Sequence, residues 1–290
     1  EGEVSSANAV IVCVGYEHEG EGKDRPFELP KPVEAQIQQL VALNRRVIVV
    51  ICTGGAVRMD WHDQTAAIFQ AGFCGQRGPA ALADLIWGTV SPSGKLPYSI
   101  ERHFADSPDP DYVPKGLNVS DQRNNLQLPG LEKPEHFTGE WPHQIHYKEG
   151  VFVGYRWYAQ QQIQPRYCFG HGLSYSQFEY RDLRVQPVDA STWEVAVDVC
   201  NVGSMDAAEV VQLYLEPVEA LAEQPARQLK GFDKVSVAAG DTQQARIYIE
   251  LDDFKSFDSS VGEAVLPTDA WHLCVGSSMQ DIRLRKVHAW

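Results

Sequence analysis

The sequence predicts an α/β unit followed by an all-β unit. Over about the first hundred residues, apolar strand-like runs alternate with segments whose apolar residues recur at helical spacing. From about residue 175 the apolar residues alternate with polar ones, which is the pattern of half-buried strands. A length of 290 residues with 43% hydrophobic residues is enough for about two domains with separate cores. We therefore divide the chain into residues 1–105, 106–172 and 173–290.

Residues 1–105 are predicted to form part of a doubly covered α/β unit. The short runs are apolar throughout, which is typical of strands covered on both faces. The expected elements are strands at 9–15, 46–52 and 66–73, and helices at 32–44 and 80–87. This β-α-β-α order predicts a mostly parallel sheet with helices on both of its faces.

Residues 106–172 and 173–290 have different patterns. Six prolines interrupt the polar stretch 108–142, so we expect a long connector there. The third segment has short strand patterns separated by glycine and proline turns, at 193–199, 210–215, 234–237, 244–249 and 271–275. Strands at this spacing predict a small antiparallel β-sandwich.

Composition excludes several classes of function. With 25 Lys and Arg against 39 Asp and Glu, the net charge of −14 disfavours nucleic-acid binding. No apolar run reaches the roughly 18 residues of a membrane span, and the first residues do not resemble a signal peptide. No cysteine pair has CxxC spacing, and no metal cluster, phosphate-binding loop or nucleophile elbow is present, so we expect no metal or cofactor. Cys13 and Cys52 lie in apolar runs and are expected to be buried free thiols, which leans weakly toward a reducing, cytoplasmic compartment while leaving localisation open.

The loop after the first strand is the strongest candidate for chemistry. Ligands of open parallel sheets bind at the carboxyl ends of the strands, and residues 16–26 at such an end carry Glu17, Glu19, Glu21 and Asp24. Two glycines flank Glu21 and give its backbone freedom. Crowding of like charges raises carboxyl pKa values, which suits general acid–base catalysis. The residues alone leave a solvated acidic loop as an open alternative.

Several motifs resemble family 3 glycoside hydrolases, in the order of that family and over most of the chain. The motifs are Glu21-Gly22-Lys23-Asp24-Arg25, Ser91-Pro92-Ser93-Gly94-Lys95-Leu96-Pro97, Glu149 to Tyr158, Phe169 to Tyr175, Glu209 to Tyr214 and Leu229-Lys230-Gly231-Phe232. The segment from Ser91 to Pro97 is the most specific of them. The earlier motifs resemble the second, α/β sandwich domain of the family, and the later ones its fibronectin type III-like C-terminal domain, an immunoglobulin-like sandwich.

The resemblance implies a retaining β-glycosidase, most simply a β-glucosidase acting on a β-glucoside or oligosaccharide. Such enzymes use two carboxylates about 5–5.5 Å apart. By motif position Glu21 is the general acid/base, with Glu19 as the rival. The nucleophile belongs to an N-terminal (β/α)8 barrel that this sequence does not contain, so we expect the chain alone to be inactive. The alternative is a non-catalytic accessory or carbohydrate-contacting module, or an inactive gene fragment.

Other residues invite a functional interpretation that we do not adopt. Asp60, in Met59-Asp60-Trp61, resembles the nucleophile motif but lies in the wrong setting. His171 is expected to be structural, and the aromatics Tyr155, Trp157 and Tyr158 are expected to serve core packing before sugar stacking. Surface or turn positions are expected for Asp182, Asp198, Asp252 and Asp253.

Overall fold

The computed structural model describes residues 2–17, 26–108, 149–219, 221 and 224–289. The chain divides into two compact units, Glu1–Gly78 with Arg102–Gly150 and Pro79–Glu101 with Val151–Trp290, and each is described by itself. The domain boundaries expected near residues 105 and 172 stay a prediction; the compact units group residues 79–101 with the C-terminal part instead. The elements in chain order are α1 (Gly2–Ser6), β1 (Val10–Val14), α2 (Lys31–Leu43), β2 (Val47–Ile51), η1 (His62–Gln64), β3 (Ala67–Gln70), α3 (Gly78–Ile86), η2 (Phe104–Asp106), α5 (Tyr155–Gln160), β4 (Phe178–Pro187), β5 (Thr192–Asn201), β6 (Ala207–Pro217), β7 (Gln228–Val237), β8 (Thr242–Glu250), η3 (Leu251–Phe254), β9 (Ser256–Asp258), β10 (Glu263–Val265), β11 (Ala270–Gly276) and β12 (Ile282–Ala289).

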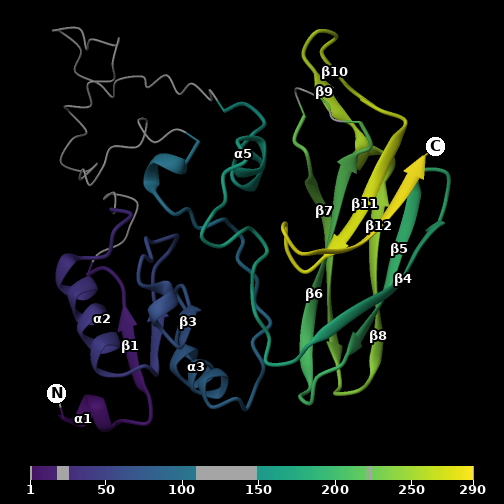
Figure 1. Ribbon diagram of the computed structural model, residues 1–290. Helices are drawn as coiled ribbons and strands as arrows, with labels where there is room; N and C mark the ends of the chain where they lie inside the picture. Colours follow the sequence, from purple (N-terminus) through teal and green to yellow (C-terminus); the bar gives the residue numbers. More distant parts are fainter. Residues whose placement is uncertain (1, 18–25, 109–148, 220, 222–223, 290) are drawn as a thin grey trace, which may run out of the picture. The chain divides into compact units, whose positions relative to one another are not determined.

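The first unit contains a parallel sheet of strand order β1-β2-β3 (Figure 1, purple to blue). Val10 lies opposite Val47 in the β1–β2 pair, and Ile48 lies opposite Ala67 in the β2–β3 pair. All described strands of this sheet run in the same direction, so their carboxyl ends meet at one edge. The predicted parallel sheet is confirmed.

Helix α2 joins β1 to β2. Pro30 precedes the helix and Pro32 lies in its first turn, where a missing backbone N–H costs nothing. Ile37 is fully buried, so this helix supplies one wall of the core. At the C-terminal end, the side-chain amide of Asn44 donates to the carbonyl oxygens of Val4 and Ala7 at 2.8 and 2.9 Å, which holds the N-terminal helix against α2.

Strand β1 differs from the expectation that both of its faces are covered. Val12 and Val14 are buried, whereas Ile11 is 47% exposed and Cys13 is exposed. Cys52, which follows β2, is also exposed, so the prediction that Cys13 and Cys52 are buried was wrong. The apolar run predicted a doubly covered strand, but only alternate residues of β1 meet packing partners in this unit.

The second unit contains an antiparallel β-sandwich, as predicted. One sheet has the order β12-β11-β6-β7 and the other β4-β5-β8. Between β8 and β11 the chain forms a separate two-stranded hairpin, β9–β10 (Figure 1, green to yellow). Val195 and Ile249 from the smaller sheet meet Leu213 and Leu273 from the larger one in a single core cluster. Inward residues at every second position of both sheets build this core.

The sequence analysis did not predict β4 or β12. Strand β4 pairs with β5 along its length, but the register shifts between Arg181 and Arg184, and Asp182 has a φ of 53°. Such a bulge moves the side chains that follow it to the opposite face of the sheet. The alternation of apolar and polar residues is therefore interrupted within the strand. In β12, the charged residues Arg285 and Lys286 follow Leu284 in succession and interrupt the alternation, and the strand lies at the edge of its sheet.

The outer face of the larger sheet is covered by other segments of the same unit. Tyr214 and Cys274 point outward from β6 and β11 and are fully buried, because Tyr155, Phe169 and Leu229 pack on them. Tyr155 begins α5, which the sequence analysis assigned to the connector. The segment before β4 is therefore an integral layer of the second unit.

Candidate functional site

The loop predicted to carry the acid/base leaves β1 at Gly15. Glu21 and its rival Glu19 lie outside the described residues, but both ends of the loop are described. The hydroxyl group of Tyr16 donates to the carbonyl oxygen of Pro26 at 2.8 Å and approaches that of Glu28 at 3.1 Å. Tyr16 therefore ties the exit from β1 to Pro26 and Glu28, in the segment that enters α2.

Gly15 sets where this loop starts. A Cβ atom at this position would lie 2.6 Å from the carbonyl oxygen of Cys52, closer than any side chain tolerates. The backbone N–H of Cys52 donates to the carbonyl oxygen of Val14 at 2.8 Å. The ends of β1 and β2 are thus in direct backbone contact, and glycine is required for this close approach.

Polar groups gather at the same edge of the sheet. Thr53, which is 1% exposed, follows β2; its hydroxyl donates to the carbonyl oxygen of Gly55 at 2.8 Å and accepts from the side-chain amide of Gln70, at the end of β3, at 3.4 Å. The Oε1 atom of Gln70 is buried with no hydrogen-bond partner among the described residues. The carboxyl edge of this sheet therefore carries the polar side chains of Thr53 and Gln70, and the carbonyl oxygen of the Gln70 side chain can still accept a hydrogen bond.

Asp60, the residue that resembles a nucleophile, is engaged in an ion pair. Its carboxylate accepts from Nε of Arg58 at 2.7 Å and from Nη2 of the same residue. Arg58 also lies 3.7 Å from Glu28, and its hydrogen bond to Asp60 raises the pKa of the guanidinium further. Asp60 is thus an ion-pair partner of Arg58, and the prediction that it is not a nucleophile stays a prediction.

The cysteines of the first unit are free thiols. Partial burial, and then the proximity of Cys13 and Cys74, raise the pKa of Cys52, so this thiol stays protonated at neutral pH. Among the residues that the structure describes, no group of three or more His, Cys, Asp or Glu side chains could hold a metal ion.

In the second unit the motif from Ser91 to Pro97 pairs with the motif from Phe169 to Tyr175. The backbone N–H of Leu96 donates to the carbonyl oxygen of His171, and that of Gly170 donates to the carbonyl oxygen of Leu96, both at 2.8 Å. The hydroxyl groups of Ser91 and Ser174 lie 2.9 Å apart. Segments about 80 residues apart in sequence thus form one backbone-paired layer.

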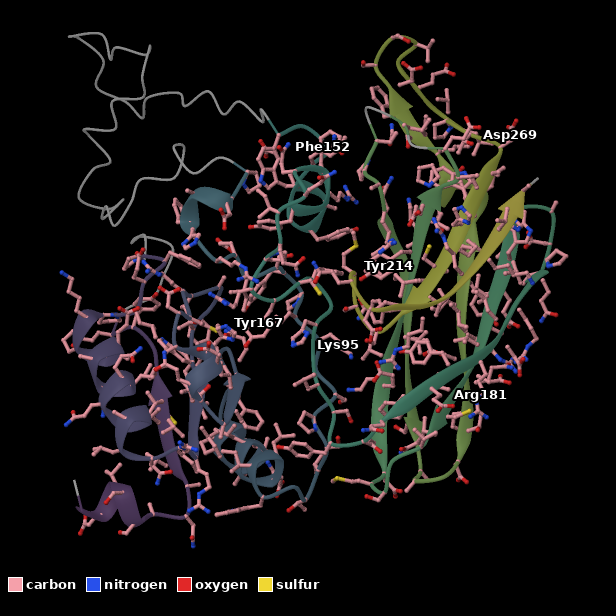
Figure 2. All side chains as sticks on the ribbon, in the orientation of Figure 1. Lys95, Phe152, Tyr167, Arg181, Tyr214 and Asp269 are labelled. Atoms are coloured by element: carbon pink, nitrogen blue, oxygen red, sulfur yellow. The ribbon has the colours of Figure 1, made fainter. Side chains whose placement is uncertain are left out.

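Lys95 connects this layer to the sandwich. Its ammonium group lies 3.1 Å from Oε1 of Glu209 and donates to the carbonyl oxygen of Gly172 at 3.1 Å. The Lys95 and Glu209 side chains are 11% and 5% exposed, and the hydroxyl of Tyr180 donates to the same carboxylate at 3.2 Å. Figure 2 shows Lys95 on the segment that runs alongside β6. Lys95, from the most specific motif, and Glu209, from the motif that ends at Tyr214, therefore form a buried ion pair that is structural in character.

His171 has a structural environment, as expected. Its ring stacks on Tyr167 with ring centroids 5.0 Å apart. Burial, and then the positive charge of Lys95, lower the pKa of His171 below its ordinary value. The imidazole of His171 is therefore stacked on a tyrosine ring and favours its neutral form, which suits the expected structural role.

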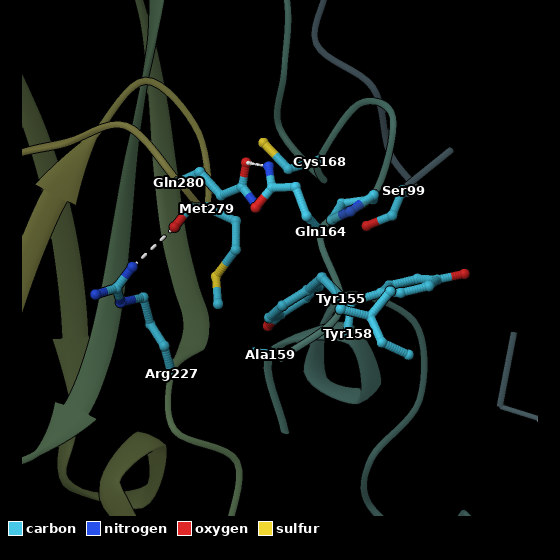
Figure 3. Close-up of a pocket in the computed structure, with 11 residues that line it drawn as sticks. Ser99, Tyr155, Tyr158, Ala159, Gln164, Cys168, Arg227, Met279 and Gln280 are labelled. Carbon is cyan, nitrogen blue, oxygen red and sulfur yellow. Dashed lines mark hydrogen bonds between the residues drawn. The ribbon is translucent and has the colours of Figure 1, made fainter. Parts of the chain in front are cut away.

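The aromatic residues of α5 mainly serve packing. The ring of Tyr155 lies 4.7 Å from that of Phe169 and 6.3 Å from that of Tyr214, and its hydroxyl accepts from the backbone N–H of Leu229 at 2.9 Å. Tyr158 is 6% exposed. Both residues nevertheless also line a pocket of about 400 Å³, shown in Figure 3. Met279 and Gln280 line its opposite side, and no sequence pattern pointed to them.

The aspartates of the sandwich lie where the sequence analysis placed them. Asp198 pairs with Arg184, and Asp252 lies 2.8 Å from Lys255. Asp253 accepts a hydrogen bond from the backbone N–H of Glu250 at 2.9 Å and caps a short turn. Asp182 occupies the bulge of β4.

Family models match both parts of the chain. Residues 1–155 match the glycosyl hydrolase family 3 C-terminal domain, and residues 209–279 match a fibronectin type III-like domain. No helix in the described ranges is both long and apolar enough to cross a membrane.

Individual proteins match nearly the whole chain. The chain is 35% identical over 285 residues to beta-glucosidase B of Emericella nidulans, covering 95% of this chain and 32% of that protein. It is 32% identical to an exo-alpha-(1->6)-L-arabinopyranosidase of Bifidobacterium longum, covering 96% of this chain and 34% of that protein. The crystal structure of the GH3 beta-glucosidase of Bifidobacterium adolescentis matches with a TM-score of 0.84 and 30% identity, over 99% of this chain and 39% of that one.

The chain thus spans about a third of the length of the curated relatives that it matches. Its coverage begins in the family's C-terminal α/β domain and continues through the fibronectin type III-like domain. The model of the family's C-terminal domain covers more than half of the sequence. The chain therefore belongs to glycosyl hydrolase family 3 and represents the C-terminal portion of its β-glucosidase-like members.

Proposed function

We propose that this chain supplies the general acid/base of a retaining β-glucosidase that hydrolyses terminal β-D-glucosyl residues, with Glu21 as the proton donor. The observation that carries the proposal is the anchoring of the acidic loop at the carboxyl edge of the parallel sheet. Tyr16 closes the loop on the segment before α2, and Gly15 sets its start against the end of β2. Ligands of open parallel sheets bind at this edge.

Retaining hydrolysis needs a second carboxylate about 5–5.5 Å from the first. We do not assign this role to Asp60, whose carboxylate is paired with Arg58. We assign the nucleophile to an N-terminal (β/α)8 barrel, either upstream on the same polypeptide or on a second chain. The isolated chain of 290 residues is then inactive toward aryl β-glucosides.

The experiment compares Glu21→Gln with Glu19→Gln in the complete protein, in which this chain is joined to its barrel. We expect Glu21→Gln to slow hydrolysis about 10²–10⁴-fold for substrates with poor leaving groups, because those need a proton from the acid. Substrates with acidic leaving groups should lose less in the first step.

Azide distinguishes an acid/base variant from a misfolded one. Azide attacks the glycosyl-enzyme without a general base, so it should accelerate turnover by Glu21→Gln and yield a β-glycosyl azide. Rescue of Glu19→Gln in place of Glu21→Gln would move the assignment by two residues. Absence of rescue in both variants, together with unchanged rates, would favour a non-catalytic accessory role.

A further inference from the structure

The pocket between α5 and the loop that joins β11 to β12 contains a positively charged group. Its volume is about 400 Å³, at the low end of the range of small-molecule sites, and its lining residues all belong to the second unit. Among the described residues that line it, Arg227 alone carries a charge. Figure 3 shows Arg227 on the side of Met279, with Tyr155 and Tyr158 across the pocket.

The carboxylate that pairs with Arg227 is shared with a second arginine. Nε and Nη2 of Arg227 donate to Oε2 of Glu216 at 3.1 and 2.8 Å, and Nη2 of Arg285 donates to Oε1 of the same carboxylate. Glu216 and Arg285 lie on β6 and β12, the two strands that flank β11. Two positive charges and one negative charge leave this arginine–glutamate cluster with a net charge of +1.

The acid that follows the pocket residue Gln280 does not cancel this excess. Asp281 lies 2.9 Å from Nη2 of Arg283 and so has an ion-pair partner of its own. Exposed charges farther away than about 8–10 Å are largely screened at physiological ionic strength, so the net charge of −14 of the whole chain has little effect here. The side chains of Arg227 and Glu216 are only 23% and 22% exposed, and partial burial weakens the screening within the cluster.

Arg227 keeps hydrogen-bond donors for a ligand. A guanidinium has five N–H groups. The bonds to Glu216 engage one on Nε and one on Nη2, and a third, on Nη1, donates to the carbonyl oxygen of Met279 at 2.8 Å. One N–H on Nη1 and one on Nη2 therefore remain, and both can donate to the oxygen atoms of an anion. Hydrogen bonds between ionised partners are about twice as strong as those between neutral ones.

The neighbouring walls of the pocket are apolar and are fixed in advance. Met279 is 8% exposed, its backbone N–H donates to the carbonyl oxygen of Phe169 at 3.1 Å, and its own carbonyl oxygen is held by Arg227. The hydroxyl of Tyr155 accepts from the backbone N–H of Leu229. Preorganised walls lower the cost of ordering on binding. Aromatic and thioether groups both attract an aromatic ring.

We propose that this pocket binds a small aromatic monocarboxylate, with the carboxylate on Arg227 and the ring against Tyr155 and Met279. The single negative charge of such a ligand balances the net charge of +1 of the cluster. The apolar walls receive the ring, and the remaining N–H groups of Arg227 receive the oxygen atoms. This site goes beyond the proposed acid/base function and uses no residue of the acidic loop.

The test is a titration of the complete 290-residue chain with benzoate, followed by ¹H–¹⁵N NMR of the arginine Nε–H signals. The Arg227 signal is assigned by its absence from the spectrum of Arg227→Gln. We expect a saturable shift with a Kd on the order of millimolar, which is usual for a ligand of about nine non-hydrogen atoms. Benzyl alcohol keeps the ring without the charge and should bind about fivefold more weakly or worse. Raising NaCl from about 50 to about 300 mM should weaken the binding of benzoate only.

Three substitutions change the charge of the cluster, with effects of opposite sign. Arg227→Gln removes the partner of the carboxylate and should weaken benzoate binding about tenfold or more. Arg285→Gln leaves Glu216 entirely to Arg227 and should weaken it about threefold or more, although Arg285 does not line the pocket. Glu216→Gln should instead tighten binding about threefold or more, because both positive charges then lack their shared carboxylate.

Arg181→Gln is the matched control. It removes one positive charge from the exposed pair with Glu179 on β4, so the net charge of the chain changes as it does in Arg285→Gln. Benzoate should bind to this variant as it binds to the parent chain. Arg285 is 48% exposed and lies on the edge strand β12, so Arg285→Gln keeps the test valid even where Arg227→Gln disturbs folding.

Absence of a saturable shift of the Arg227 signal with benzoate at about 50 mM would overturn the proposal. Equal affinity for benzoate and benzyl alcohol, unchanged binding by Arg285→Gln, or weaker binding by Glu216→Gln would overturn it too. The proposed catalytic role is tested separately, because Glu21→Gln should leave this titration unchanged. A failure here and a failure of Glu21 are therefore distinguishable.

Discussion

Removal of the ammonium group of Lys95 tests how strongly the motif segment is bound to the sandwich. Lys95 and Glu209 are 3.1 Å apart, with side chains 11% and 5% exposed. At an effective dielectric constant of about 20, two charges at this distance attract by about 5 kcal/mol, before the cost of desolvation. In Lys95→Met the Glu209 carboxylate keeps the hydrogen bond from the hydroxyl of Tyr180 but loses its ion-pair partner. Breaking a buried ion pair by removing one partner costs about 3–5 kcal/mol.

The assay is chemical and thermal unfolding of Lys95→Met, Glu209→Gln and the double variant. A unit of this size loses about 2–4 °C in Tm per kcal/mol, so Lys95→Met should lower the Tm by about 10 °C. The double variant should recover more than half of this loss, because Glu209→Gln removes the buried charge and still accepts from Tyr180.

Arg181→Met is the control for a surface pair. Arg181 lies beside Glu179, and the two side chains are 58% and 53% exposed, so solvent screens their attraction and the Tm should hardly change. If Lys95→Met costs no more than Arg181→Met, the Lys95–Glu209 pair is not effectively buried and the reasoning fails. If the double variant is as unstable as Lys95→Met, the loss comes from packing of the lysine stem and not from charge.

Two further predictions concern the loop start and the buried histidine. Gly15→Ala should cost about 1–3 kcal/mol in the free energy of unfolding, because the new Cβ atom meets the backbone oxygen of Cys52 at 2.6 Å. Gly2→Ala, with no atom within 4 Å of the new Cβ, should be neutral in the same urea titration, and equal stability of the two variants would contradict the close approach. The pKa of His171 is lowered in the folded chain, so the unfolded chain binds the proton first and stability should fall as the pH drops below about 6.5. His171→Phe keeps a ring against Tyr167 and should lose less stability between about pH 7 and pH 5; part of the slope should remain because the pKa of His288 is also lowered by burial. An identical slope in the variant and the parent chain would remove His171 from this account.

The exposed face of β1 explains one error of the sequence analysis. A run such as Val10–Val14 predicts a strand with two covered faces, because every residue is apolar. The structure buries Val12 and Val14 but leaves Ile11 exposed. Hydrophobicity states what a residue prefers, whereas burial depends on which other segments are there to cover it.

The bulge in β4 explains another. Asp182 adopts a positive φ of 53°, and the pairing with β5 shifts between Arg181 and Arg184. A period of two is a local property of a regular strand, so one extra residue conceals it. The strand forms because it pairs with β5 and packs on the core of the sandwich. The sequence of the ten residues of β4 alone shows neither interaction.

The order of the units, the parallel character of the first sheet and the family could all be predicted from the amino-acid sequence. These depend on local periodicity and on motifs, which short windows record. Three contacts could be seen only in the folded chain: Lys95 pairs with Glu209, Tyr16 donates to the carbonyl oxygen of Pro26, and Met279 and Gln280 line a pocket opposite α5. Each of these contacts joins residues distant in sequence or on different elements, and their energies depend on distance and burial, which the chain acquires only when it folds.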